Sequence, residues 1–445
     1  MISKIFNLFK KKEVLTKIKQ KFYFYKNFNS KNQKLIDSFQ YLQQDEIKKV
    51  QQEKLKKILK TAVTSVPFYK ELNLNIDFKN FTINELKKFP IIDKSIIQKN
   101  PLKFISNKNK GYVNSTSGSS GIPFQFHLPY NSWAIETMTT YRAWGMGNDY
   151  VYKFKDPIII LRSYVPNDNE PITRIDRDRN YWYVSPFHIN ESNLNEIITF
   201  IKTSKSKILR GYASSIYIFT LLLINNKIFL EQIKVIVTSS EMLIPKYREV
   251  IENFFKIKVL DHYGHNESVI TVQQCSEGNY HNSDDYGYIE YDDDNNIIGT
   301  SLNNNVMPFI RYNTNDRAIR NKESESIVNC LCGRKLTIPF IAIEGRSDDI
   351  LIKKDGTHIP TANFSTAMKN YSRLKQFQII QNENTSLILN IVIENPDQAY
   401  LNQIKGEVLK RLGNLELNIN LVDEIKRDIK TGKVKVTIQK IKNAC

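Results

Sequence analysis

The chain has 445 residues, more than one hydrophobic core ordinarily spans, so we expect at least two domains. Hydrophobic residues make up 41% of the chain and aromatic residues 11%, which excludes a disordered or fibrous protein. The formal net charge is +18, but residues 1–60 alone contain sixteen lysines and five acidic residues. Because the excess charge is concentrated in one arm and no nucleic-acid recognition motif is present, we expect no nucleic-acid partner.

Residues 1–60 are predicted to form a basic helical arm, because apolar residues such as Ile18, Phe22 and Tyr25 recur at helical spacing. Two interpretations are open. The apolar residues beside Lys10, Lys11 and Lys12 suit peripheral contact with anionic lipid, whereas a helix packed on the body would leave the same lysines in solvent. The chain has no run of ~20 apolar residues and no signal-peptide pattern. We therefore expect a cytoplasmic location, which the first interpretation places at the inner face of the membrane.

The middle of the chain alternates apolar strands with helices, which predicts a parallel α/β sheet. Residues 67–101 precede it as short helices punctuated by prolines. The expected strands are residues 158–161, 208–209, 233–238 and 259–260, and the expected helices are residues 214–225 and 245–255.

Residues 286–345 contain shorter strands with Asn, Asp and Gly turns, which favours an antiparallel region. After Gly345 we expect a small α+β unit, with strands at residues 349–352, 377–381, 387–393 and 433–438 and helices at 360–371 and 399–412. The predicted domains are the arm at 1–60, a body at 61–345 and a C-terminal lid at 346–445.

Glycines are rare in this chain, so their clusters carry information about where the backbone bends or approaches a ligand. The segment Asn114-Ser-Thr-Ser-Gly-Ser-Ser-Gly-Ile-Pro123 has the donors expected of a phosphate cradle, but it lacks the ending of a Walker loop. Alone, such a segment is also typical of a linker. The segment Asp261-His-Tyr-Gly-His-Asn-Glu267 follows a predicted strand, where α/β proteins place ligands, and Glu267 could hold Mg²⁺ or simply cap a turn.

Further motifs follow in a fixed order. Ser240-Glu241 precedes the Tyr-Gly-x-x-Glu segment, and Arg-Tyr-x-Thr-x-Asp316, Gly345-Arg-Ser-Asp-Asp349 and Thr431-Gly-Lys433 come after it. Together they resemble the adenylate-forming superfamily of acyl-CoA synthetases, luciferases and peptide-synthetase adenylation domains. Within it the sequence is most similar to phenylacetate-CoA ligases and to the CapK-like proteins of polysaccharide gene clusters. The likeness covers about residues 60–440.

The resemblance implies an α/β fold with a large multi-sheet N-terminal body and a small mobile α+β lid. It also implies ATP and Mg²⁺ as cofactors, with a small-molecule carboxylate and an acceptor as substrates. The implied roles are: phosphate contacts from the loop Thr116, Ser117, Gly118, Ser119, Ser120 and Gly121; an adenine pocket at Ser240 and Glu241; stacking on adenine by Tyr263 beside Gly264; Mg²⁺ at Glu267; ribose contacts from Asp316 and Arg346; a hinge at Asp348; and a catalytic lid lysine, Lys433.

The sequence departs from the superfamily pattern at three positions. Ile122 stands where many members have Lys, Asn266 where Thr is frequent, and Asn315 where Gly is usual. The first change removes a cation that would face phosphate. The third is compatible with the motif, because Asn tolerates the left-handed backbone conformation better than most residues. We expect activity to be retained.

Four residues suit tetrahedral Zn²⁺, namely Cys275, His281, Cys330 and Cys332. The Cys-x-Cys spacing is tighter than usual, so reduced free thiols are the alternative. By the resemblance, CapK-like proteins often carry a comparable set. His265 either faces the acyl pocket as a catalytic group or is a turn histidine bonded to backbone.

The predicted function is an ATP-dependent ligase that forms an acyl-adenylate and transfers the acyl group to CoA or another acceptor. One alternative is an amide-forming ligase that decorates capsular polysaccharide or O-antigen. An alternative of another class is a basic, non-catalytic binding protein. The residues fit the chemistry of an enzyme: attack of a carboxylate on the α-phosphate brings anionic oxygens together, and Lys433 and a metal at Glu267 could neutralise them.

Overall fold

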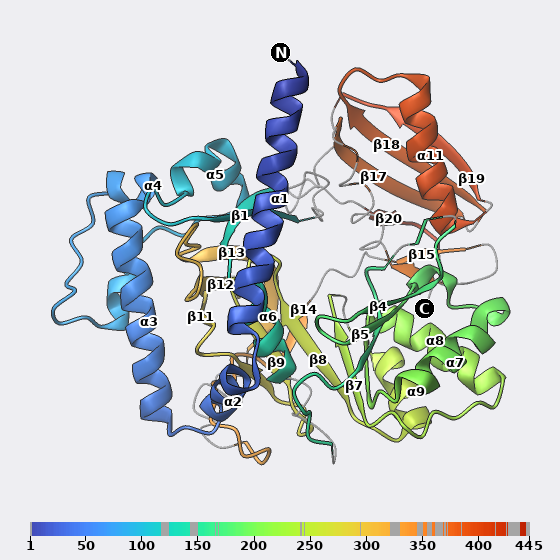
Figure 1. Ribbon diagram of the computed structural model, residues 1–445, viewed down its shortest axis with the longest axis horizontal. Helices are drawn as coiled ribbons and strands as arrows, with labels where there is room; N and C mark the ends of the chain where they lie inside the picture. Colours follow the sequence, from blue (N-terminus) through green and yellow to red (C-terminus); the bar gives the residue numbers. More distant parts are fainter. Residues whose placement is uncertain are drawn as a thin grey trace. The chain divides into compact units, whose positions relative to one another are not determined.

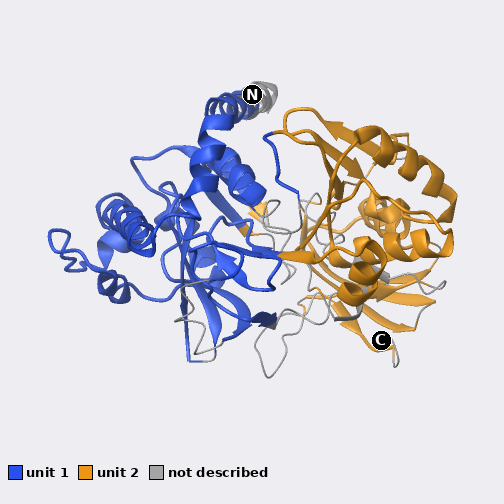
Figure 2. Ribbon diagram, turned by 90° about the horizontal axis from the view of Figure 1, so that it is seen from below, with its two compact units in different colours: residues 1–114, 125–154, 262–344 blue, residues 115–124, 155–261, 345–445 orange. Residues whose placement is uncertain are grey.

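The computed structural model describes most of the chain as two compact units (Figure 2). Unit 1 comprises residues 1–114, 125–154 and 262–344, and unit 2 comprises residues 115–124, 155–261 and 345–445. The described residues are 2–116, 124–142, 150–164, 166–167, 169–240, 243, 245–293, 295–320, 330–344, 350–353, 358–360, 368, 371, 373–383, 385–413, 415–423, 425 and 437–441. The domain boundaries expected at residues 60 and 345 stay a prediction.

Unit 1 begins with a series of helices, which confirms the helical arm and the short helices after it (Figure 1). They are α1 (Ile2–Asn27), α2 (Ser30–Phe39), α3 (Gln44–Ser65), α4 (Pro67–Glu71) and α5 (Lys94–Lys99), with 3₁₀ helices η1 (Ile83–Lys88) and η2 (Pro101–Phe104). Local sequence sets their starts: the Asn29 side chain accepts from the amide of Asn32 ahead of α2, and Pro67 opens α4. Within the described part of the chain, none of the helices is both long enough and apolar enough to span a bilayer.

The remaining elements in the described part of unit 1 are a helix and mostly antiparallel strands. The helix is α6 (Ser132–Tyr141), and β1 (Gly111–Thr116) pairs with β2 (Phe124–Pro129). A four-stranded antiparallel sheet follows the order β11 (Gly287–Tyr291), β12 (Asn296–Ser301), β13 (Tyr312–Ile319), β14 (Ala342–Glu344). This sheet confirms the antiparallel region expected over residues 286–345.

Unit 2 contains the parallel sheet that the alternating pattern predicted. β3 (Ile158–Leu161) pairs in parallel with β5 (Tyr181–Val184) and β6 (Ile208–Gly211), and β6 pairs in parallel with β7 (Val235–Ser239). All residues of β3 and β7 are buried, which explains their continuous apolar runs. The 3₁₀ helices η4 (Pro186–His188) and η5 (Glu191–Asn193) follow β5, and the helices are α7 (Leu194–Ser204), α8 (Ala213–Asn225) and α9 (Pro245–Phe255).

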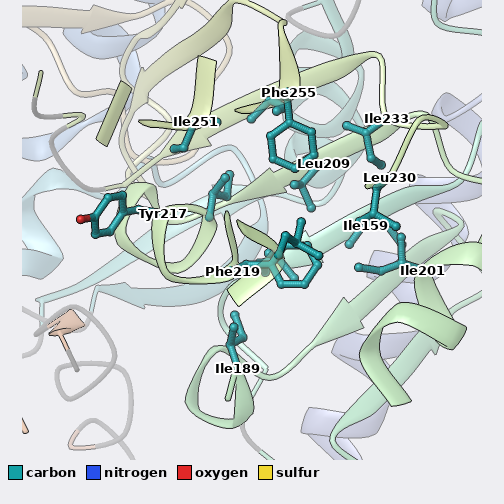
Figure 3. Close-up of a cluster of buried hydrophobic side chains, with 14 of the residues drawn as sticks. Ile159, Ile189, Ile201, Leu209, Tyr217, Phe219, Leu230, Ile233, Ile251 and Phe255 are labelled. Carbon is teal, nitrogen blue, oxygen red and sulfur yellow. The ribbon is translucent and has the colours of Figure 1, made fainter. Parts of the chain in front are cut away.

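The core of this sheet forms where helices cover it. Figure 3 shows Phe219 of α8, Leu209 of β6 and Ile159 of β3 within one cluster of buried side chains. Because α8 is apolar on nearly all sides, it is a buried helix rather than an amphipathic one.

The sheet is not wholly parallel, which corrects the expected topology. β4 (Thr173–Asp176) runs antiparallel to β5, and neither strand was expected from the sequence. β8 (Val259–Gly264) begins in unit 2 and ends in unit 1, where it pairs antiparallel with β9 (Thr271–Gln274), and β9 with β10 (Tyr280–Asn282). In this sheet, the strands that were missed are three or four residues long, too short to show a clear period.

The C-terminal part of unit 2 is a small α+β assembly, as expected. Its main sheet has the order β19 (Glu416–Leu421), β18 (Ser386–Ile393), β17 (Leu374–Glu383), β20 (Thr437–Gln439), and α11 (Gln398–Leu412) shares a buried core with it. β15 (Ile350–Ile352) and β16 (His358–Pro360) form a separate hairpin. The helix expected at residues 360–371 and the start of the last expected strand lie mostly outside the described residues.

Candidate functional site

Polar side chains gather at the carboxyl ends of the parallel strands in unit 2. Arg162 follows β3, Tyr212 follows β6 and Ser239 ends β7. Nη1 of Arg162 donates to Oγ of Ser239 at 2.6 Å, and the guanidinium lies 5.6 Å from the centre of the Tyr212 ring. Ligands of open α/β sheets bind at this edge, so these side chains are candidates for ligand contact. Sequence reasoning missed Arg162, and its position directly after a buried strand is the signal that could have found it.

Ser240 stands next to this edge in a conformation that non-glycine residues seldom adopt. Its φ is +71°, in the left-handed region, and its side chain is exposed. The preceding strand, β7, is bonded to β8 through side chains, because Oγ1 of Thr238 donates to Oδ1 of Asp261 at 2.7 Å in the interior. Backbone strain of this kind recurs at ligand sites. Glu241, the other residue expected at the adenine pocket, lies outside the described residues.

In unit 1, two motifs that are distant in sequence meet at the end of β8. Oη of Tyr263 donates to Oδ2 of Asp316 at 2.9 Å, and the same hydroxyl lies 2.8 Å from Nε2 of His265. Nε2 of His265 is 3.4 Å from that carboxylate oxygen. The expected alternatives for His265 were an acyl-pocket group and a histidine bonded to backbone, and its described bonds run to these two side chains. We call Tyr263, His265 and Asp316 the tyrosine cluster.

The turn before Asp316 has the geometry expected from its sequence. Asn315 has a φ of +60°, so it takes the left-handed conformation for which glycine is usual, as predicted. Its amide donates to Oδ1 of Asn313 at 2.8 Å, and the amide of Asp316 donates to Oγ1 of Thr314 at 3.2 Å. These local bonds orient Asp316 toward Tyr263.

One polar group of the tyrosine cluster and one beside it are only partly stabilised by hydrogen bonds or by opposite charge. Nδ1 of His265 is buried and has no hydrogen-bond partner among the residues that the structure describes. Burial raises the pKa of Glu267, and the nearby Asp316 carboxyl acts in the same direction, whereas His265 and Lys94 oppose the rise. Such groups are stabilised when a ligand supplies a hydrogen bond or a positive charge. Gly264 ends β8 and is exposed.

Several of the expected site residues cannot be placed. Thr116 ends β1, and nothing further is described of its side chain. The others lie outside the described residues, and they are Ser117, Gly118, Ser119, Ser120, Gly121, Glu241, Arg346, Asp348 and Lys433. Their roles stay predictions.

A second cluster in unit 1 brings Cys275, His281, Cys330 and Cys332 together. Their ligand atoms all lie within 4.8 Å of one another. Sγ of Cys275 is 3.7 Å from Sγ of Cys330, and Sγ of Cys332 is 3.4 Å from Nε2 of His281. Tetrahedral zinc with Zn–S bonds of about 2.3 Å requires sulfurs about 3.8 Å apart, so the geometry fits this metal.

The surroundings of these four residues also suit a metal. Nδ1 of His281 lies 3.3 Å from the carbonyl of Leu336, which leaves Nε2 available as a ligand. The hydrogen bond with Cys275 lowers the pKa of Cys332 and favours its thiolate. Gly333, with a φ of +82°, turns the chain after Cys332.

Comparison with known proteins places the fold. Residues 351–440 match the family model of the CapK C-terminal domain. No curated protein matches the chain by sequence. A 2-hydroxyisobutyryl-CoA ligase, solved with 2-HIB-AMP and CoA in the thioesterification state, matches with a TM-score of 0.57 and 16% identity over 90% of this chain and 92% of that one. The chain has the fold of an adenylate-forming acyl-CoA ligase.

Other states of the same relative agree. Its open conformation with 2-HIB-AMP and CoA matches with a TM-score of 0.54 and 16% identity, over 90% of this chain and 93% of that one. Its postadenylation state with R3-HIB-AMP matches with a TM-score of 0.53 and 16% identity, over 90% and 91%. The ligase fold confirms the predicted α/β class, with a larger N-terminal body and a smaller C-terminal domain.

Proposed function

We propose that the protein is an ATP-dependent, AMP-forming ligase that activates a carboxylic acid as its acyl-adenylate and transfers the acyl group to CoA. The observation that carries this proposal is the tyrosine cluster, in which residues 53 positions apart bond directly. The ligase fold and the CapK match support it. The ligase fold favours an enzyme over a non-catalytic binding protein, since the tyrosine cluster alone would suit either.

The first step forms the acyl-adenylate. An oxygen of the substrate carboxylate forms a bond to the α-phosphorus, while the bond from that phosphorus to the bridging oxygen breaks and pyrophosphate leaves with the electron pair. Asp316, oriented by Tyr263, accepts hydrogen bonds from ribose hydroxyls, and the Tyr263 ring contacts the base. Lys433 stabilises the negative charge that develops between the carboxylate and the phosphate.

The second step transfers the acyl group. The sulfur of CoA forms a bond to the acyl carbon, the bond from that carbon to the AMP oxygen breaks, and the thiol proton passes to solvent. Residues 346–445 form the domain that is proposed to move between the two steps, with Asp348 as its hinge.

Magnesium fits the chemistry of Glu267. Glu267 is half-buried, the pKa of its carboxyl is raised, and Asp316 is close enough to contribute to that rise, while Mg²⁺ prefers carboxylate oxygens. A metal held there would neutralise phosphate charge. Glu267 lies three residues after the end of β8.

Zinc fits the cysteine–histidine cluster, and we propose that it is structural. All four ligand positions would be filled by protein atoms, which leaves none for a substrate. The ligands come from the turn after β9, from β10 and from the segment at residues 330–332, so a metal would join parts of unit 1 that are far apart in sequence.

A second candidate function is an amide-forming ligase that acts in polysaccharide decoration. The match of residues 351–440 to the CapK C-terminal domain favours it. The two candidates share the adenylation step and differ only in whether a thiol or an amine attacks the acyl carbon.

Pyrophosphate release, measured against a library of carboxylic acids with CoA or amines as acceptors, tests both candidates. We expect release with at least one acid and formation of AMP. Lys433→Ala should lower the rate at least about 100-fold while ATP binding persists, because the lysine acts mainly in the transition state. Lys440→Ala, which removes an exposed lysine of the same domain, should have no effect. ATP binding without pyrophosphate release for any acid would contradict the proposal.

A further inference from the structure

Helix α1 has one buried face, which attaches it to unit 1. Phe24 and Phe28 are only 1% and 4% exposed. The ring of Phe24 lies 4.2 Å from that of Trp133, and the ring of Phe28 lies 4.8 Å from that of Phe154. The C-terminal end of α1 is therefore part of the core of unit 1 and is not a detachable arm.

A different face of the same helix carries apolar side chains into solvent. Val14, Leu15, Ile18, Phe22 and Tyr25 are each between 49% and 61% exposed. At about 100° per residue they fall within an arc of about 100°, which lies about 80–180° around the helix from Phe24. We call these five residues the exposed face of α1. An apolar surface of this extent on a helix is a feature of interaction sites.

Positive charge borders this face on both sides. Lys17 and Lys21 lie along one edge and Lys19 and Lys26 along the other, as the helical period requires, and all four side chains are exposed. Residues 14–36 contain no acidic residue. A partner must therefore offer an apolar surface together with negative charge.

We propose that the exposed face of α1 docks on an anionic lipid bilayer, with α1 lying in the plane of the interface. The apolar side chains enter the boundary between headgroups and acyl chains, while Lys17, Lys21 and Lys26 contact anionic headgroups. A second copy of this helix fits poorly, because its lysines would meet lysines. The contact involves residues 14–26 and is independent of the proposed ligase reaction.

Sedimentation with vesicles tests this proposal. The full chain should bind vesicles of phosphatidylcholine with phosphatidylserine, bind vesicles of phosphatidylcholine alone far less, and lose binding as salt is raised. Ile18→Ser with Phe22→Ser should lower the partition coefficient more than tenfold, since both apolar side chains would leave the interface. Leu102→Ser with Leu421→Ser removes two other exposed apolar side chains and should change nothing.

The charge is tested in the same way. Each lysine near an anionic surface contributes about fivefold to partitioning, so Lys17→Gln with Lys21→Gln should weaken binding about 25-fold. Lys49→Gln with Lys60→Gln on α3 is the matched control, because it removes the same charge from another exposed helix surface. Melting temperatures should show that every variant is folded, since the substituted side chains are exposed.

Two results would overturn the proposal. Equal binding to neutral and anionic vesicles, or no binding to either at low salt, would remove the lipid partner. Sedimentation velocity that shows a dimer in the full chain, lost in the Ile18→Ser, Phe22→Ser variant, would assign the exposed face of α1 to a second copy instead.

Discussion

Two groups of polar side chains in unit 1 differ in how their charges are compensated. In the first, which we call the arginine cluster, Nη1 and Nη2 of Arg142 donate to the two carboxylate oxygens of Asp285, each at 2.9 Å. Nζ of Lys54 donates to the carbonyl of Asp285 at 2.6 Å and to Oδ1 of Asn303 at 3.3 Å. In the tyrosine cluster, a hydroxyl and an imidazole approach the carboxylate of Asp316.

The pKa shifts show the same difference. Burial alone would raise the pKa of Asp285, but Arg142 and Lys54 hold it below its ordinary value. At Glu267, beside the tyrosine cluster, burial prevails and the pKa is raised. Removing one partner of a buried ion pair leaves the other charge without compensation and destabilises the fold, whereas a carboxyl that is only partly compensated is stabilised further when a ligand supplies positive charge. We therefore assign the arginine cluster to stability and the tyrosine cluster to binding.

The largest expected effect is on stability, from Arg142→Met. This change leaves the carboxylate of Asp285 buried without its guanidinium, which should lower the free energy of unfolding by about 3–5 kcal/mol. Denaturant unfolding measures it. Lys103→Met removes one partner of an exposed pair with Glu71 and should cost less than about 1 kcal/mol.

A pH series sharpens this prediction. Because the folded pKa of Asp285 is depressed, its contribution is present above the unfolded pKa of 3.8 and is lost as pH falls through the lower folded value. Asp284, whose pKa is raised by burial, titrates above that window. The difference between wild type and Arg142→Met should therefore shrink on acidification below pH 3.8. A difference that is constant with pH would mean that packing, not charge, is lost.

The next largest effect is expected at the cysteine–histidine cluster. If it holds zinc, the purified protein should contain about one equivalent, and Cys330→Ser should lower both metal content and stability, by roughly 2–3 kcal/mol, because bound metal stabilises the folded state. Elemental analysis and thermal unfolding measure the two quantities. Leu331→Ser lies between two ligands and is 92% exposed, so it should change neither. Metal-free protein of full stability would leave these residues as free thiols.

Asp316→Asn should affect binding more than folding. The amide keeps the shape but loses the charge that strengthens hydrogen bonds to ribose hydroxyls, so kcat/KM for ATP should fall about 10–100-fold. Stability should change by less than about 1 kcal/mol. Asp293→Asn, at an exposed position in a loop, is the control. A loss of stability as large as that of Arg142→Met would place Asp316 with the arginine cluster.

Sequence patterns predicted where helices and strands lie better than they predicted which side chains of those elements are buried. The strand at residues 158–161 and the helix at 245–255 have the bounds expected, because apolar runs and amphipathic periods are local signals. In α1 the helix was predicted, and packing on the body was one of its two interpretations, which the burial of Phe24 and Phe28 bears out, but the sequence did not show which aromatic residues are buried. Phe22, Tyr23, Phe24 and Tyr25 are consecutive aromatics, so hydrophobicity alone does not show that Phe24 is buried while Phe22 is exposed.

The candidate site shows the same limit. The turn at Asn315 could be predicted, because a left-handed residue is a local requirement. The arginine cluster could not be predicted, because Arg142 and Asp285 are 143 residues apart and no periodicity links them. Arg162 was missed for a similar reason, since its partner Ser239 belongs to another strand.

The smallest expected effect, Tyr263→Phe, separates two roles within the tyrosine cluster. The substitution keeps the ring for contact with the base but removes the hydroxyl that donates to Asp316 and lies beside Nε2 of His265. One such bond contributes about 1 kcal/mol, so KM for ATP should rise about fivefold with kcat nearly unchanged. Tyr263→Leu removes the ring as well and should raise KM further. If Tyr263→Phe and Tyr263→Leu were equally impaired, the hydroxyl would carry the whole effect and the ring would not contact the base. If Tyr263→Phe behaved as wild type, Asp316 would be held by other groups, and the cluster would not be the unit proposed here.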